Sequence, residues 1–84
     1  MPLFVLLDEP VDPQVNTQVL RHYFQTFENA VQASHGEILA SRNNDLELAI
    51  EPVYDDENNI VGYALFNPNE ELVESITVQA VYPA

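Results

Sequence analysis

Three clusters of turn-forming residues divide the second half of this 84-residue chain into short segments of strand type. The clusters are Asn43-Asn44-Asp45, Asp55-Asp56-Glu57-Asn58-Asn59 and Asn67-Pro68-Asn69-Glu70-Glu71. Asn and Asp tolerate left-handed backbone angles and Pro favours turns, so each cluster predicts a reversal of the chain. Strands joined by short turns pair with their neighbours in sequence, and an antiparallel sheet is therefore predicted.

The segments beside these clusters have the apolar patterns of strands. Residues 46–50 alternate between apolar and polar types until Pro52, which predicts a half-buried strand that is confined to the sheet edge or broken by a bulge. Further strands are predicted at 60–66 and 72–82, and a short one at 37–42. The apolar run 3–7, stopped by Asp8-Glu9-Pro10, predicts a buried strand at the start of the chain.

One long helix is predicted between the first strand and the others. Asp12 followed by Pro13 suits a helix N-cap with proline in the first turn, and Gly36 after His35 suits the helix end. The apolar residues between them recur at spacings of three and four: Val15, Val19, Leu20, Tyr23, Phe24, Phe27, Ala30 and Val31. The sequence thus predicts a single α+β domain, 1–84, with one long helix packed on a single antiparallel sheet of four to five strands, in the order β-α-β-β-β-β.

The charge of the chain is unusual in its sign. There are 14 Asp and Glu residues against Arg21 and Arg42, with no Lys, so the formal net charge is −12. Direct DNA or RNA binding requires a basic patch that neutralises phosphates, and two arginines cannot form one. Nucleic acids and anionic membranes are therefore not expected as direct partners, whereas a basic protein surface is favoured by fast, electrostatically steered association.

The absence of cysteine bears on the expected location. Small secreted domains often depend on disulfides, so we expect a cytoplasmic protein, or one of the host cytoplasm if it is viral. The apolar N-terminus lacks a basic region and reaches Asp8-Glu9 after too few residues for a signal peptide or a membrane span.

Residue types suited to catalysis or metal binding are few. There is no Cys nucleophile or Lys base, and the neighbours Ser34 and His35 have no G-x-S-x-G context. The spacing of His22 and His35 does not indicate a shared metal site, and the 55–59 turn lacks the ligand pattern of an EF-hand loop. We expect no enzymatic activity, cofactor or metal, although a small-ligand site between helix and sheet remains an open alternative.

Strand 60–66 predicts an apolar patch on the sheet face that the helix does not cover. The residues of this strand fall into two sets of opposite parity, so one set is left on the open face whichever set meets the helix. The sets are Val61, Tyr63 and Leu65, and Ile60, Gly62, Ala64 and Phe66. Carboxylates and hydroxyls of the neighbouring strands frame this patch. Such a surface is typical of a protein-binding face, and a dimer interface or ordinary surface is the alternative interpretation.

Carboxylates at strand spacing can imitate the phosphates of a duplex and occupy a DNA-binding groove. We therefore hypothesise a stoichiometric inhibitor that mimics DNA and docks the basic groove of a nucleic-acid-binding enzyme or defence complex. The candidate partner contacts are eight carboxylates with two possible anchors: Glu47, Glu51, Asp55, Asp56, Glu57, Glu70, Glu71, Glu74, Tyr63 and Leu65. Two alternatives stay open: acidity that serves solubility alone, and a small homo-oligomeric assembly or regulatory subunit that binds a protein through its open sheet face or edge.

The chain resembles the phage uracil-DNA glycosylase inhibitors in its length and acidity and in two short segments. These segments are Glu74-Ser75-Ile76 in a strand and Tyr54-Asp55-Asp56-Glu57 leading a hairpin. In that family the Glu-Ser-Ile strand follows N-terminal helices, whereas here it is the last strand. The resemblance implies inhibition of a DNA-binding enzyme and adds Ser75 and Ile76 to Glu74 as candidate contacts. The predicted element order also looks cystatin-like, but the Gln-x-Val-x-Gly motif of protease inhibition is absent.

Overall fold

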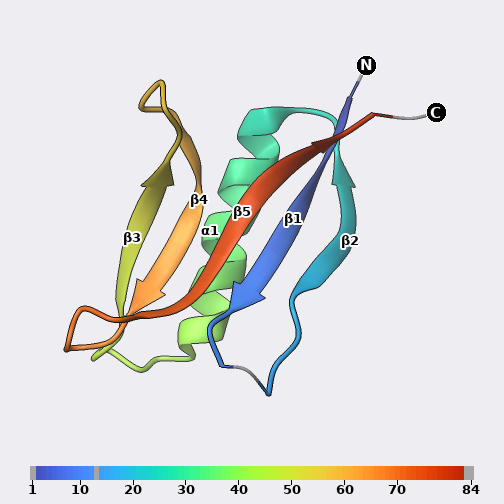
Figure 1. Cartoon of the computed structure of the whole chain (residues 1–84). Coiled ribbons are helices and arrows are strands. Elements are labelled where there is room, and N and C mark those ends of the chain that lie inside the picture. The colour runs from blue at the N-terminus through green and yellow to red at the C-terminus, as the bar shows by residue number, and fades with distance from the viewer. Residues whose placement is uncertain (1, 13, 83–84) are drawn as a thin grey trace.

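Five strands and one helix make up the fold of the residues that the structure describes. The computed structural model describes residues 2–12 and 14–82, without the side chains at positions 21 and 22. The elements are β1 (Leu3–Pro10), β2 (Gln18–Phe24), α1 (Phe27–Arg42), β3 (Ala49–Tyr54), β4 (Ile60–Phe66) and β5 (Leu72–Val81). The strands form one antiparallel sheet in the spatial order β2-β1-β5-β4-β3, and α1 packs on one face of it (Figure 1). The predicted α+β class, with one helix on one antiparallel sheet, is confirmed.

The predicted order of elements is wrong, because the helix lies after the second strand. The observed order is β-β-α-β-β-β. The helix begins at the N-cap Thr26, whose side chain accepts a hydrogen bond of 3.2 Å from the Asn29 N–H. It ends at Asn43, which adopts left-handed backbone angles (φ 49°, ψ 48°) and donates its N–H to the Leu39 carbonyl. Gly36, predicted as the helix end, lies inside the helix.

The segment that was expected to form the first half of the helix is the edge strand β2. Residues four apart share a face in a strand as well as in a helix, so the pairs Leu20/Phe24 and Val19/Tyr23 fit both structures. Leu20 and Phe24 pack against the core, while Val19 and Tyr23 are exposed. β-branched and aromatic residues favour the strand. The predicted helix start at position 13 lies outside the described residues.

Two further local predictions are wrong because the helix lies later in the chain than predicted. Asp12 accepts a hydrogen bond of 2.9 Å from the Gln14 N–H and so stabilises a turn between β1 and β2 instead of capping a helix. Residues 37–42, predicted as a strand, complete the helix, and Ile38 is fully buried against the sheet.

The strands of the second half agree with the prediction more closely. β4 has the predicted bounds, β5 begins at the predicted residue, and the turns between them are in place. β3 begins at Ala49, later than predicted, and carries Pro52 at the sheet edge, with a register shift between Val53 and Tyr54. Proline is tolerated there because the outer edge needs no ladder hydrogen bond.

The core lies between α1 and the three central strands. Its buried side chains are Leu6, Ala30, Ile38, Leu65 and Ile76. Phe4 of β1 extends the core with an edge-to-face contact to Phe27, at 5.8 Å between ring centroids. The opposite face of the sheet is turned toward the viewer in Figure 1, and no other element of the described residues covers it.

Candidate protein-binding surface

Carboxylates are concentrated at the β3 edge of the sheet. Residues 43–84 contain nine Asp and Glu residues and no Lys, Arg or His. β3 is an edge strand, and exposed carboxylates lie along it and at both of its ends: Asp45, Glu47, Glu51, Asp55, Asp56 and Glu57. The β4–β5 turn, which carries Glu70 and Glu71, lies at the end of the sheet where β3 begins (Figure 1). We call these eight residues the acidic margin.

The open face beside this margin combines small apolar residues with carboxylates. Ala64 lies opposite both Glu51 and Ser75, and Ser75 lies opposite Glu9 in the next pair. Ala64 itself is buried and Ser75 is half-buried. The predicted parity holds for residues 63–66: Tyr63 and Leu65 belong to the helix side, and Ala64 and Phe66 belong to the open side. It is wrong for Ile60, which faces α1 because the β3–β4 register shifts between Val53 and Tyr54.

A hollow of about 490 Å³ lies where the acidic margin meets the open face. It is lined by three carboxylates, one aromatic ring and small residues: Glu47, Glu51, Glu70, Phe66, Ala49, Asn67 and Pro68. Phe66 is half-buried and lies opposite Ala49 in the β3–β4 pair. An aromatic ring among carboxylates suits a cationic side chain, because the ring face and the negative charges both attract it.

The turn that forms one wall of this hollow is fixed by Asn67. Its side-chain oxygen accepts hydrogen bonds from the backbone N–H of Asn69 (3.0 Å) and of Glu71 (2.9 Å). Glu70 adopts a left-handed backbone conformation (φ 63°) in the same turn. The Asn67 side-chain amide donates a hydrogen bond to the Glu71 carboxylate at 3.3 Å. Glu70 lines the hollow. Glu71 supports the turn through its hydrogen bonds with Asn67.

The three carboxylates of the hollow do not form a metal site. Among the residues that the structure describes, no group of three His, Cys, Asp or Glu side chains is close enough to hold a metal ion. Carboxylates spread around a hollow match a larger cation, such as a guanidinium or ammonium group on a side chain, better than a single metal ion.

The β3–β4 hairpin tip forms the other end of the acidic margin. The Asp55 carboxylate accepts hydrogen bonds from the backbone N–H of Glu57 (2.8 Å) and Asn59 (2.9 Å). These bonds, the one from Asn59 first, lower the pKa of Asp55 below its usual value. Asp56 and Glu57 remain exposed. The tip is a hydrogen-bonded turn that presents its negative charges to solvent.

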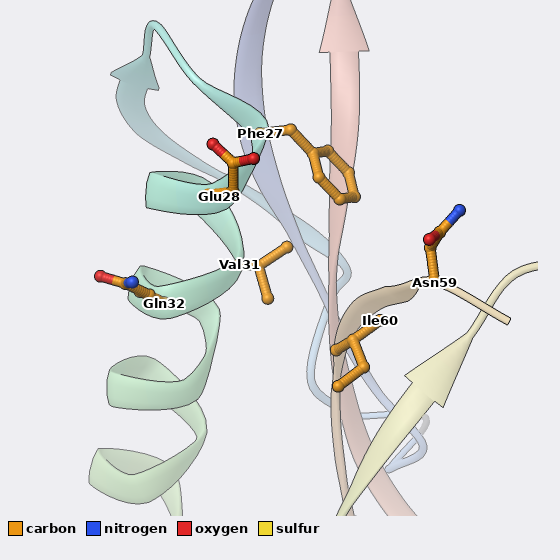
Figure 2. A pocket seen from close by; sticks show the side chains of 6 residues that line it. All are labelled: Phe27, Glu28, Val31, Gln32, Asn59 and Ile60. Carbon is orange, nitrogen blue, oxygen red and sulfur yellow. The ribbon is translucent and has the colours of Figure 1, made fainter.

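A second hollow, of about 530 Å³, lies on the helix side near this tip. Figure 2 shows Phe27 and Val31 of α1 directed toward Ile60 at the start of β4, with Glu28 and Asn59 at the rim. Gln32 completes the lining from the helix. The hollow has an apolar floor and a polar rim, and it lies between helix and sheet, where the sequence leaves a small-ligand site open as an alternative.

Two of the predicted contacts lie inside the protein. Leu65 and Ile76 are each 1% exposed and belong to the core, so they cannot serve as surface contacts in this fold. Tyr63 is half-buried on the helix side, where its ring lies 4.6 Å from that of His35. Phe66 takes the place of Leu65 as the candidate anchor, and its shared parity with Ala64 was the signal that could have identified it.

The Ser34-His35 pair makes separate contacts. Ser34 is buried and its hydroxyl donates to the Val31 carbonyl at 2.6 Å. The adjacent His35 is exposed and contacts Tyr63. The side chain of His22 is outside the described residues.

Glu74 lies apart from the acidic margin, on the helix side of the sheet. It lies opposite Leu65 in one pair and Pro10 in the other, and it neighbours Asp8 of β1 and Ser41 near the end of α1. Burial raises the pKa of Glu74 to about 7, with the Asp8 carboxylate adding to the increase and a hydrogen bond to Ser41 opposing it. Asp8 Oδ1 is buried and has no hydrogen-bond partner in the part of the chain that the structure describes. A protonated Glu74 supplies the donor that two ionised carboxylates lack.

Glu74→Gln is expected to remove a pH-dependent loss of stability. The pKa of Glu74 is higher in the fold (about 7) than its ordinary value of 4.5, so folding favours the protonated form. That stability is fully present below the unfolded pKa and is lost as pH rises through the folded pKa. Gln stays neutral and keeps a donor for Asp8. Because Glu74 is only half-buried, screening limits the gain of the variant above neutral pH to about 1–2 kcal/mol.

Urea unfolding of the parent and Glu74→Gln across acidic to mildly alkaline pH measures this difference. Glu71→Gln is the matched control, since it removes the same charge from an exposed turn. We expect the Glu74→Gln advantage to grow with pH and to vanish at acidic pH. Parallel pH profiles of the two variants would contradict the assignment.

Comparisons of this chain with protein-family models, with curated proteins and with solved structures find no match. In the part of the chain that the structure describes, the helix lacks the length and apolar character needed to cross a membrane.

Proposed function

We propose that this chain is a non-catalytic, acidic protein-binding module that inhibits its partner by occupying a basic groove in place of DNA. The observation that carries the proposal is the hollow where Glu47, Glu51 and Glu70 surround Phe66 at the sheet edge. A DNA-binding groove presents Arg and Lys side chains that are spaced for phosphates. One of these cations fits the hollow, with its charge near the carboxylates and its planar or methylene part against Phe66.

The charge distribution supports a partner with a basic surface. The acidic margin contributes eight carboxylates with no cation in residues 43–84, so its field is not cancelled locally. Such a field steers a basic partner toward the β3 edge and raises the association rate, in a manner that salt suppresses. The open face beside the margin adds half-buried apolar and hydroxyl groups, which suit the interior of an interface.

Capture from a bacterial lysate with the immobilised chain, followed by elution with a duplex DNA competitor, tests this function. We expect nucleic-acid-binding proteins to be retained at low salt and to be released by duplex DNA, because the acidic margin and the duplex occupy the same groove. The charge-neutral variant Glu47→Gln/Glu51→Gln/Glu70→Gln is expected to bind the captured protein about tenfold more weakly, since three exposed ion pairs are lost.

The matched control is the variant Asp12→Asn/Glu28→Gln/Glu37→Gln, which removes the same charge from exposed positions outside the acidic margin and the open face. We expect it to weaken capture only slightly, through the smaller net charge. Equal loss in both variants would show a response to net charge alone and would contradict the assigned hollow. Retained proteins that duplex DNA does not release would contradict the mimicry.

A further inference from the structure

The two edges of the sheet differ sharply in charge and in protection. The β3 edge carries Pro52 and is flanked by the acidic margin, two features that discourage another strand from pairing there. The β2 edge has neither. Between Gln14 and Phe27 the sequence contains no Asp or Glu and no Pro, and it includes Arg21.

The outer side of β2 is open to pairing. β2 is the terminal strand of the sheet and is paired with β1 alone among the described residues. Its pairing with β1 is regular from Gln18 to Leu20 and shifts in register beyond. Val19 is 55% exposed and Tyr23 is 64% exposed, so two apolar side chains lie beside the free backbone groups. An exposed edge of this kind, without carboxylates, is a template for another strand.

Charge decides which strand can occupy it. Two copies of a chain with a net charge of −12 repel each other, and the repulsion is greatest where carboxylates face carboxylates. The β2 edge is the segment on which two copies can approach without bringing carboxylates of the contact strands together. A symmetric contact of one strand with its own copy also closes after two subunits, so it does not lead to open fibres.

We propose that two copies of this chain associate through antiparallel pairing of their β2 edges, which joins the two sheets into one continuous sheet. The acidic margins then lie at the two far edges of the dimer, where both remain available to a partner. Dimerisation does not depend on the function proposed above, because it uses the opposite edge of the sheet.

Sedimentation equilibrium of the purified full chain over a wide concentration range tests the dimer. We expect a mass that rises from 9.5 kDa toward twice that value, and a dimer that becomes stronger as salt screens the repulsion between the copies. Binding of a basic partner is expected to weaken as salt is added. A failure of the dimer proposal can therefore be distinguished from a failure of the proposed function. A chain that remains monomeric at all concentrations and salt levels would overturn the dimer.

Val19→Glu is expected to weaken the dimer about tenfold or more, because it places like charges close together across the new strand pair and removes an apolar contact. Leu46→Glu is the matched control. Leu46 is 82% exposed next to the acidic margin, and its substitution also replaces an aliphatic side chain by a carboxylate. Equal weakening by both variants, or no weakening by Val19→Glu, would overturn the β2 assignment.

Amide hydrogen exchange of the unaltered chain tests the same contact without a substitution. The amides of Gln18 to Leu20 that point away from β1 are expected to become more protected as the protein concentration is raised, while those of the other edge strand, β3, remain unchanged. Concentration-dependent protection of the β3 amides, with none in β2, would assign the contact to the β3 edge and overturn the proposal.

Discussion

Gly62→Ala is expected to lower the free energy of unfolding by about 3 kcal/mol. Gly62 lies in β4 beside the central strand β5. A Cβ atom at this position would lie 2.1 Å from the Ile76 carbonyl oxygen and 2.7 Å from the Thr77 Cα. Both are backbone atoms of a paired strand, so relief requires the two strands to separate. Urea unfolding followed by far-ultraviolet circular dichroism measures the loss.

Gly36→Ala provides the control with the same chemical change and the opposite expected sign. Gly36 lies inside α1, and an added Cβ would meet nothing within 4 Å. Because alanine is a better helix former than glycine, this variant is expected to gain about 1 kcal/mol. If the free energy of unfolding of Gly62→Ala equals that of the parent within experimental error, β4 and β5 are not as close as the structure has them.

Ile76→Ala is expected to cost about 3 kcal/mol of stability, because the side chain is removed from the centre of the core. Ile76 packs in the same cluster as Leu6, Ile38 and Leu65. Leu72→Ala in the same strand is the control: Leu72 is exposed, and we expect it to cost less than about 1 kcal/mol. Thermal or urea unfolding of both variants provides the comparison.

This experiment also separates two roles for Ile76. The resemblance to the glycosylase inhibitors implies a partner contact at Ile76, whereas its burial assigns it to folding. If Ile76→Ala left stability unchanged and weakened partner capture, the surface role would be restored. A stability loss with capture retained by the remaining folded protein would support the core role.

The sequence was sufficient for the second half of the fold because its signals are local. The clusters at 43–45, 55–59 and 67–71 contain residues that stabilise their own turns, as Asp55 and Asn67 do through hydrogen bonds to nearby backbone N–H groups. Pro52 indicated an edge or bulge from its missing N–H alone. These features depend on residues a few positions apart, so they can be predicted without knowledge of the tertiary contacts.

The first half could not be predicted in this way. A spacing of four residues places Leu20 and Phe24 on one face of a strand or a helix alike, and only the contact with β1 decides between them. Once residues 18–24 pair with β1, the helix must begin later, at the Thr26 cap, and it continues through Gly36 because Ile38 is buried against the sheet.

For the candidate site, the sequence by itself determined the sign of the charge and its concentration in residues 43–84, since composition and order contain both. Only the tertiary structure decided which of the predicted contacts reach the surface. It buried Leu65 and Ile76, brought Glu70 from a turn to Glu47 and Glu51 around Phe66, and placed Glu74 against Asp8. The physical reason is that register and helix position set the surroundings of each side chain, and both arise from contacts between residues distant in the sequence.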